Sequence, residues 1–254
     1  FFKRQNGPFF SVITVVKNDE KNIIKTITSV SNQTFKDYEY IVIDGLSKDN
    51  TVNKILLKKK NINRFISKKD GGIYFAMNKG ISLAKGKVIV FVNSGDVLTK
   101  NALKKVSEKF INTKNLDFVF GTVKRYYTTK SVLKYNFNPK RILYNFDFAT
   151  AHSTGFFIKK NRLVDMGKFN TKYKISADYD IYYKTIVINK LKGDSTSKTN
   201  LIGIVQSGGH SSKFSFFQHL LEETRIRLNN NQNLIFILMI FVNALIKCII
   251  KKLF

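Results

Sequence analysis

The chain is poor in cysteine and has no tryptophan. Its 254 residues contain one cysteine, Cys248, which excludes an internal disulfide framework and a zinc cluster built on thiolates. This usage fits a reducing compartment such as the cytosol. The segment 1–6 is short, carries Lys3 and Arg4, and is not followed by a small-residue cleavage site, so it does not resemble a secretory signal. We therefore expect a cytoplasmic protein.

Acidic residues are also scarce. The chain has 17 Asp and Glu against 44 Lys and Arg, which gives a formal net charge of +27. Nucleic-acid-binding proteins usually concentrate Arg and Lys in one arm, helix or stripe with aromatic residues for stacking. Here the positive charge is mostly lysine and is spread along the whole chain. We therefore predict no nucleic-acid partner and a basic surface suited to anionic lipid or a polyanionic substrate.

Apolar, β-branched runs alternate with helix-like segments over about the first 110 residues. The runs at 9–16, 38–44, 64–67 and 87–92 predict strands, and 73–84 predicts one of the helices between them. This alternation indicates an α/β fold with a parallel sheet that helices cover on both faces.

The second half of the chain has a looser pattern. Its expected elements are strands at 118–127, 155–158 and 201–205 and a helix at 178–189. No internal repeat or low-complexity linker separates the two halves. We therefore expect one catalytic domain over 1–212 and a C-terminal helical tail over 213–254.

Several of the few carboxylates follow expected strands. Asp44 and Asp96 each come at a strand end, and Asp70 comes just before a helix. Open α/β sheets bind their ligands at this edge. The turn 17–20 carries two carboxylates instead of glycines, which disfavours a dinucleotide pyrophosphate there. The acids suit a nucleotide with a divalent cation, although Asp44 could equally be an ordinary turn-capping residue.

Taken together, these segments resemble the family 2 glycosyltransferases, which are inverting enzymes with the GT-A fold. The matching segments are 11–18, 29–35, 37–51, 70–80 and 84–96. The resemblance is dense over about residues 9–100 and thinner to about 212. It implies a Rossmann-like mixed sheet with helices on both faces, followed by C-terminal helices. The implied reaction moves one sugar from a nucleotide-diphosphate sugar, expected to be a UDP-sugar, to a saccharide or lipid-linked acceptor in bacterial surface-polysaccharide assembly.

The resemblance also implies roles for individual residues on the donor side. Thr14 and Asp44 are expected to hold the base and ribose, Asp70 to close the nucleoside pocket, and Asn78 to lie near the diphosphate. These four residues belong to the matching segments of the sequence.

A metal site is implied by the same resemblance. Asp96 corresponds to the last acid of the family's Asp-X-Asp motif, and Ser94 replaces the first acid. One carboxylate fewer should weaken the site and leave Mg²⁺ or Mn²⁺ dependent on diphosphate oxygens and water, ligands that Mg²⁺ commonly keeps.

Inverting transfer needs a base that deprotonates the acceptor hydroxyl on the side opposite the leaving group. Asp178 and Asp180 are the candidates, and residues two apart on a helix face different directions. The family's base motif aligns with 177–178. We therefore predict Asp178 as the base, with Asp180 as an acceptor-side, capping or structural residue.

Three histidines complete the candidate set. His152 introduces a strand beside the expected acceptor pocket, where a packed or surface role is equally open. His210 follows two glycines in a loop that could bring its imidazole to the metal or a phosphate, although a lone loop histidine is often simply solvated. His219 lies on an expected helix and is interpreted as structural.

The Gln-X-X-Arg-Trp motif of processive family members is absent because the chain has no tryptophan. We therefore expect one sugar to be added per encounter. Two alternatives to the glycosyltransferase interpretation remain open. One is a metal-dependent nucleotidyltransferase, and the other is a basic membrane- or nucleic-acid-binding module without catalysis.

The tail carries an apolar run over 234–246, followed by Lys247, Lys251 and Lys252. A helix of this run would be about 20 Å long, shorter than the ~30 Å hydrocarbon core of a bilayer. We expect it to lie in the membrane interface, with lysines on anionic headgroups, at the inner face of the cell membrane. Burial against the catalytic domain or a partner subunit is the alternative.

Overall fold

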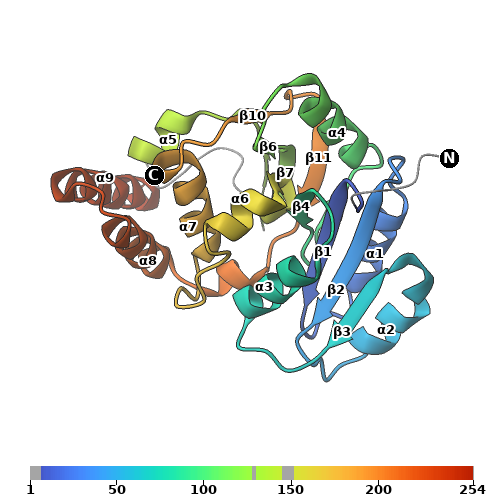
Figure 1. Cartoon of the computed structure of the whole chain (residues 1–254). Helices are drawn as coiled ribbons and strands as arrows, with labels where there is room; N and C mark the ends of the chain where they lie inside the picture. Colours follow the sequence, from blue (N-terminus) through green and yellow to red (C-terminus); the bar gives the residue numbers. More distant parts are fainter. Residues whose placement is uncertain (1–6, 128–129, 145–151, 254) are drawn as a thin grey trace.

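The computed structural model describes residues 7–127, 130–144 and 152–253 (Figure 1). Within them, a seven-stranded sheet has the strand order β10-β6-β9-β4-β1-β2-β3. Its strands are β1 Phe10–Val16, β2 Tyr38–Asp44, β3 Arg64–Ser67, β4 Val88–Phe91, β6 Phe118–Phe120, β9 Phe156–Lys159 and β10 Gly193–Ser195. Strands β1 to β4 are parallel, as predicted, whereas β9 is antiparallel to both β4 and β6.

A second sheet has the order β5-β11-β7-β8, with β5 Val97–Leu98, β7 Thr122–Tyr126, β8 Ser131–Lys134 and β11 Leu201–Val205. The sequence predicted one strand over 118–127, but the chain changes sheets at Gly121, whose N–H donates to the Gly155 carbonyl at 2.7 Å. A Cβ on Gly121 would lie 2.8 Å from the Ile202 side chain. The glycine therefore permits the close approach of β11 at this junction.

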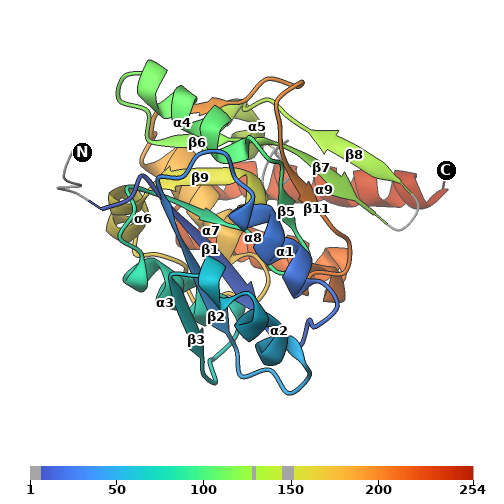
Figure 2. The same cartoon turned by 90° about the vertical axis from the view of Figure 1, so that its right-hand side faces the viewer.

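Helices cover both faces of the central sheet, as predicted. They are α1 Ile23–Ser31, α2 Thr51–Leu57, α3 Ile73–Leu83, α4 Ala102–Asn112, α5 Pro139–Tyr144, α6 Lys160–Asp165, α7 Ala177–Tyr183, α8 Phe216–Asn229 and α9 Leu234–Leu253. The helix expected over 178–189 is α7 continued by a π-helical turn, Lys184–Ile188. Figure 2 shows α1 in front of the sheet, with α7 and α8 behind it.

The core forms two apolar clusters, one on each face of the sheet. Along β1, Val12 and Val16 belong to the cluster with α1, α2 and α4, whereas Ile13 and Val15 belong to the cluster with α3, α6 and α7. Side chains alternate between the faces of a strand, so a sheet buried on both faces needs the continuous apolar runs found in this sequence.

The C-terminal segment packs on the rest of the structure through α8. Leu220 and Ile226 of α8 are 2% and 0% exposed, and α9 buries Ile237 and Ile240. Among the described residues, no helix combines the length and apolar character needed to cross a membrane.

Candidate active site

One cleft of about 1030 Å³ opens beyond the carboxyl ends of β1 and β4. Its walls come from the loop after β1, the start of α3, the turn 93–96, the start of α7, the loop 206–214 and α8. Among the predicted residues it brings together Asp70, Ser94, Asp96, His152, Asp178 and His210. The scarce carboxylates thus meet where an open α/β sheet places its ligand.

Asp96 is held in a tight turn at the floor of the cleft. Gly95 has a φ of +96°, a conformation that favours glycine, and the Asp96 N–H donates to the Asn93 carbonyl at 3.0 Å. The carboxylate is 5% exposed and accepts hydrogen bonds from Thr154 Oγ1 at 2.7 Å and the Gln206 N–H at 3.1 Å. Burial raises the pKa of Asp96 to about 7, against the opposing effect of these bonds and of Arg125.

His152 lies beside this carboxylate. Its Nδ1 is 3.8 Å from Asp96 Oδ2 and accepts the Thr154 N–H at 3.3 Å. Burial, helped by the positive charge of Arg125, lowers the pKa of His152 to about 4. The imidazole is therefore neutral near pH 7, so it gives this wall of the cleft a polar group without a charge.

Asp178 lies in the first turn of α7 and faces the cleft. Its Oδ1 accepts the Tyr179 N–H at 2.9 Å and lies 3.5 Å from the Tyr74 hydroxyl. Burial raises the pKa of this carboxyl, with His152 and His219 acting in the opposite direction. A carboxylate with raised proton affinity in a cleft has the properties of a general base.

Asp70 and Ser94 form the side of the cleft nearest β1 and β2. Asp70 Oδ1 accepts the Gly72 N–H at 3.0 Å, and Ser94 Oγ donates to Asp19 Oδ2 at 2.7 Å. Asp19, one of the two carboxylates of the turn 17–20, also lines the cleft and accepts the hydrogen bond that orients the Ser94 hydroxyl.

The positions of three other predicted residues differ from the expectation. Thr14 is fully buried, and its hydroxyl donates to the Val92 carbonyl at 2.7 Å. Asn78 binds the backbone of Phe169 through both its amide atoms, at 2.8 and 2.9 Å. Neither lines the cleft. Both side chains join core elements, so direct contact with a ligand would require breaking these bonds.

Asp44 is likewise fully buried at the end of β2 and does not line the cleft. Its carboxylate accepts the Ser47 N–H at 3.0 Å, the Ser47 hydroxyl, and the Ser67 hydroxyl at 2.6 Å. This is the turn-capping role that the sequence left open.

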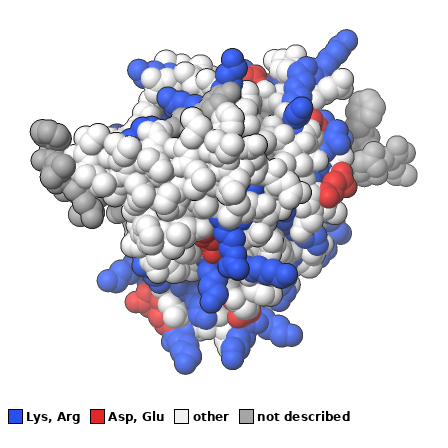
Figure 3. All heavy atoms as spheres, turned by 90° about the vertical axis from the view of Figure 1, so that its left-hand side faces the viewer, with Lys and Arg blue, Asp and Glu red and all other residues white. Residues whose placement is uncertain are grey.

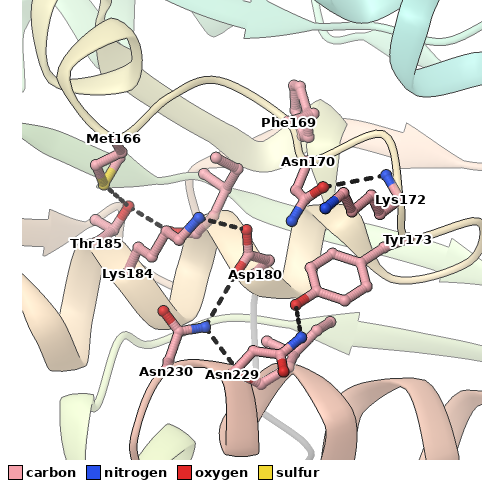
Figure 4. A network of polar contacts seen from close by, with 12 residues as sticks. Met166, Phe169, Asn170, Lys172, Tyr173, Asp180, Lys184, Thr185, Asn229 and Asn230 are labelled. Atoms are coloured by element: carbon pink, nitrogen blue, oxygen red, sulfur yellow. Dashed lines mark hydrogen bonds and ion pairs between the residues drawn. The ribbon is translucent and has the colours of Figure 1, made fainter.

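Asp180 points away from the cleft toward α8 (Figure 4). It is 1% exposed, forms a 2.8 Å ion pair with Lys184, and accepts a hydrogen bond from Asn230 at 3.1 Å. Asp178 and Asp180 thus face different directions, as their spacing predicted. Asp180 does not line the cleft, and its contacts to Lys184 and Asn230 fit the structural role that was the other expectation for it.

The metal expectation rests on Asp96. Within the part of the chain that the structure describes, no three His, Cys, Asp or Glu residues are grouped to hold a metal ion. His210 lines the cleft, but its Nε2 contacts the Lys174 carbonyl at 2.9 Å. The residues therefore fit a cation that has Asp96 as its acidic protein ligand and takes other oxygens from substrate and water.

Sequence reasoning missed cleft residues from the middle of the chain and from its C-terminal part. Arg125 comes from β7, and His219 and Glu223 come from α8. His219 also binds the Ser211 carbonyl at 2.9 Å. In a chain with 44 basic residues nothing local distinguishes Arg125, and a helical histidine carries no signal of the cleft that it faces.

Comparisons with known proteins identify the family of this chain. The family model described as glycosyl transferase family 2 matches residues 11–171. Chondroitin synthase of Pasteurella multocida is 29% identical over 212 residues, which are 76% of this chain and 22% of that protein. A PGL/p-HBAD biosynthesis glycosyltransferase of Mycobacterium bovis is 27% identical over 178 residues, 68% of each protein. The chain thus spans about a fifth of the synthase and two thirds of the mycobacterial protein.

Solved structures share the fold. Staphylococcus aureus TarS 1–349 in complex with UDP-GlcNAc superposes with a TM-score of 0.70 at 21% identity, covering 93% of this chain and 71% of that one. The mannosyltransferase PcManGT of Pyrobaculum calidifontis, in complex with GDP-Man and Mn²⁺, has a TM-score of 0.66 at 15% identity, covering 94% and 70%. The predicted GT-A fold is confirmed.

Proposed function

This chain belongs to glycosyl transferase family 2, and we propose that it transfers one sugar, with inversion, from a UDP-sugar to a hydroxyl of a saccharide or lipid-linked acceptor. The observation that carries the proposal is that Asp96 and Asp178 come from opposite halves of the chain and face one cleft. TarS, which superposes on this chain, binds UDP-GlcNAc, and this favours a UDP-sugar.

In the proposed reaction the acceptor oxygen forms a bond to the anomeric carbon while the bond from that carbon to the diphosphate breaks. Asp178 takes the acceptor proton, which its raised pKa favours. Single displacement from the opposite side inverts the anomeric centre. Asp96 would hold a divalent cation, which would stabilise the negative charge of the departing diphosphate.

The remaining cleft residues orient the substrates in this proposal. Asp70 and Ser94 lie on the donor side, and His152 lies between Asp96 and the acceptor side. Arg125 adds positive charge close to Asp96. Because no processivity motif is present, we infer transfer of one sugar per encounter.

Hydrolysis and transfer assays with a panel of nucleotide-sugars test this function. We expect UDP release from a UDP-sugar that depends on Mg²⁺ or Mn²⁺, and binding of UDP that the cation strengthens. Pyrophosphate release from a nucleoside triphosphate and a sugar phosphate would instead identify a nucleotidyltransferase. Absence of both reactions with every donor would refute catalysis of either kind.

We also propose that the outer side of α8 and α9 binds an anionic membrane surface. Along α9 the exposed apolar side chains are at least 41% accessible, and they are Leu234, Ile235, Phe236, Leu238, Met239, Val242, Ile246, Ile249 and Ile250. On α8 they are Phe216, Phe217, Leu221 and Leu228. Figure 3 shows this side as a broad area almost without charge, with Lys and Arg at its margin.

The charge pattern favours an anionic lipid surface over an acid-binding protein face. Helix α9 contains no Asp or Glu. The two acids of α8 are turned inward, because Glu222 binds the backbone before α7 and Glu223 lines the cleft. An apolar surface with a basic margin is the pattern of interfacial membrane helices. Such a contact would place the protein at the inner face of the membrane, near a lipid-linked acceptor.

Liposome sedimentation tests the membrane contact. The double substitution Leu238→Glu with Val242→Glu should abolish binding to vesicles that contain phosphatidylglycerol. Leu57→Glu is the matched control, because Leu57 is 81% exposed on α2. Unchanged sedimentation of the double variant would refute the proposal. A lipid-independent dimer that the double variant loses would assign the surface to a second copy instead.

A further inference from the structure

The backbone just before α7 is held by one side chain of α8. Three consecutive N–H groups, those of Lys174, Ile175 and Ser176, donate to the Glu222 carboxylate at 2.8, 2.7 and 2.6 Å. Glu222 lies more than 45 residues further along the chain. The segment 174–176 leads directly into Asp178, so this contact links α8 to the proposed base.

Three further side chains, from α3, the loop before α8 and α8 itself, contact the same segment. The Tyr74 hydroxyl of α3 donates to the Ile175 carbonyl at 2.6 Å, and His219 Nδ1 lies 3.4 Å from Ser176 Oγ. His210 Nε2 contacts the Lys174 carbonyl at 2.9 Å. The polar groups of the backbone before α7 are therefore bound by residues distant in sequence.

Helix α7 needs such support because of its own sequence. It has seven residues, and its N-cap Ser176 makes no side-chain capping bond. Isolated helices of this length are unstable, so tertiary contacts must place it. The other end of α8 adds contacts of the same kind, since Asn230 binds Asp180 at 3.1 Å and Asn229 binds Tyr173 at 2.9 Å (Figure 4).

We propose that Glu222 is a positioning residue, which sets the location of Asp178 through the backbone of residues 174–176. The inference rests on the proposed function, in which Asp178 is the base. Hydrogen bonds to an ionised carboxylate are stronger than neutral ones, and three of them fix the start of the helix. A small displacement of a base from its substrate lowers turnover strongly. The segment beyond residue 212 is therefore part of the catalytic machinery.

The test compares Glu222→Gln with Glu222→Asp and with the control Glu108→Gln. Glutamine removes the charge and one acceptor oxygen, whereas aspartate keeps both but shortens the reach by one methylene. Glu108 is exposed on α4, so its substitution makes the same charge change away from the cleft. Measurements are amide hydrogen exchange over 174–180, kcat, and the donor KM.

In Glu222→Gln we expect faster amide hydrogen exchange over 174–180 and a kcat at least tenfold lower than in wild type. The KM for the donor should change less than about twofold, because a base stabilises the transition state and not the bound donor. Glu222→Asp should lie between this variant and wild type, and Glu108→Gln should match wild type. Adding Glu222→Gln to Asp178→Asn should cause no further loss, because both changes act through one group.

Hydrogen exchange needs no activity, so failures of the two proposals can be distinguished. Unchanged exchange in Glu222→Gln, or loosened exchange with wild-type kcat, would overturn the positioning role while leaving sugar transfer intact. Equal rises in donor KM and losses in kcat would show a general structural role and would also overturn it. If Glu222→Gln does not fold, the same criteria apply to Glu222→Asp. A wild-type chain that transfers no sugar would overturn the proposed function, and the role of Glu222 with it.

Discussion

Asp96→Asn should lower activity and raise stability at high pH. The residue is proposed to hold the cation, so with saturating Mn²⁺ the variant should lose at least tenfold in transfer, about 1.4 kcal/mol. At the same time the Asp96 side chain is 7% exposed, and its ionised form is poorly solvated. Removing the charge should therefore relieve a cost that the folded protein bears when the carboxyl ionises.

The size of this effect follows from the pKa. Burial raises the pKa of Asp96 from the ordinary 3.8 to about 7. The folded state thus binds this proton more tightly than the unfolded chain, and its free energy of unfolding falls as pH rises between these values. From about pH 5 to about pH 8, wild type should lose at most about 3 kcal/mol through this group, and Asp96→Asn should lose none of it.

Urea unfolding of both proteins without metal, at these two pH values, measures the difference. A hydrogen bond lost from Thr154 or Gln206 on substitution costs the same at both values, so it cancels. Other carboxyl groups titrate alike in both proteins. The variant should gain about 2 to 3 kcal/mol relative to wild type from the lower to the higher pH. Parallel pH dependence of the two proteins would refute the assignment of a raised pKa to Asp96.

Three further outcomes test other parts of the site. Asp178→Asn should reduce kcat by at least about a hundredfold, with little change in the affinity for UDP measured by calorimetry. A loss of UDP affinity as large as the loss of kcat would show that Asp178 binds the donor instead. Asp180→Asn breaks the ion pair between the buried Asp180 and Lys184, whose side chain is 24% exposed, so the free energy of unfolding in urea should fall by about 1 to 3 kcal/mol. The kcat of this variant should stay within about twofold of wild type. A larger loss of kcat than in Asp178→Asn would make Asp180 the base instead. Ser94→Asp places a second carboxylate beside Asp19, so it should tighten Mn²⁺ binding and, because the two negative charges repel each other, destabilise the metal-free protein. An unchanged affinity for Mn²⁺ would show that the cation binds elsewhere.

Local sequence signals predicted the first half of the fold well. Strands β2 and β3 begin and end where the apolar runs 38–44 and 64–67 do. Strand β2 is buried on both faces of a parallel sheet, so its residues form a nearly continuous apolar run, whereas β3 at the sheet edge is only partly buried. The switch from β6 to β7 at Gly121 was missed because it depends on the approach of Ile202, about 80 residues away.

The site was predicted in part for the same reason. Asp70, Asp96 and Asp178 line the cleft, as predicted. Their positions could be predicted because the end of a strand and the start of a helix can be recognised from neighbouring residues in the sequence. The expected contacts of Thr14 and Asn78 depended on the direction of each side chain, which the packing of α3 and β4 decides. The contribution of α8 could not be recognised at all, since its partners lie more than 40 residues earlier.

Arg227 of α8 gives the last prediction. It is 0% exposed, and its guanidinium lies 5.6 and 5.3 Å from the ring centroids of Tyr179 and Tyr183. The guanidinium also donates hydrogen bonds to the carbonyls of Ile142 and Leu143 and to the side-chain oxygen of Gln232. Arg227→Lys keeps the positive charge, but the single ammonium group of lysine cannot reach all the acceptors that the two terminal nitrogens of the planar guanidinium reach. Two lost charged hydrogen bonds should cost about 3 kcal/mol or more by urea unfolding.

Arg225→Lys is the matched control for this substitution, because Arg225 is exposed on the same helix. It should change stability by less than about 0.5 kcal/mol. A cost below about 1 kcal/mol for Arg227→Lys would show that the guanidinium geometry contributes little. The larger cost would mean that a buried arginine, packed on Tyr179 and Tyr183, holds α8 to α7, so that the C-terminal helices and the cleft fold as one cooperative unit.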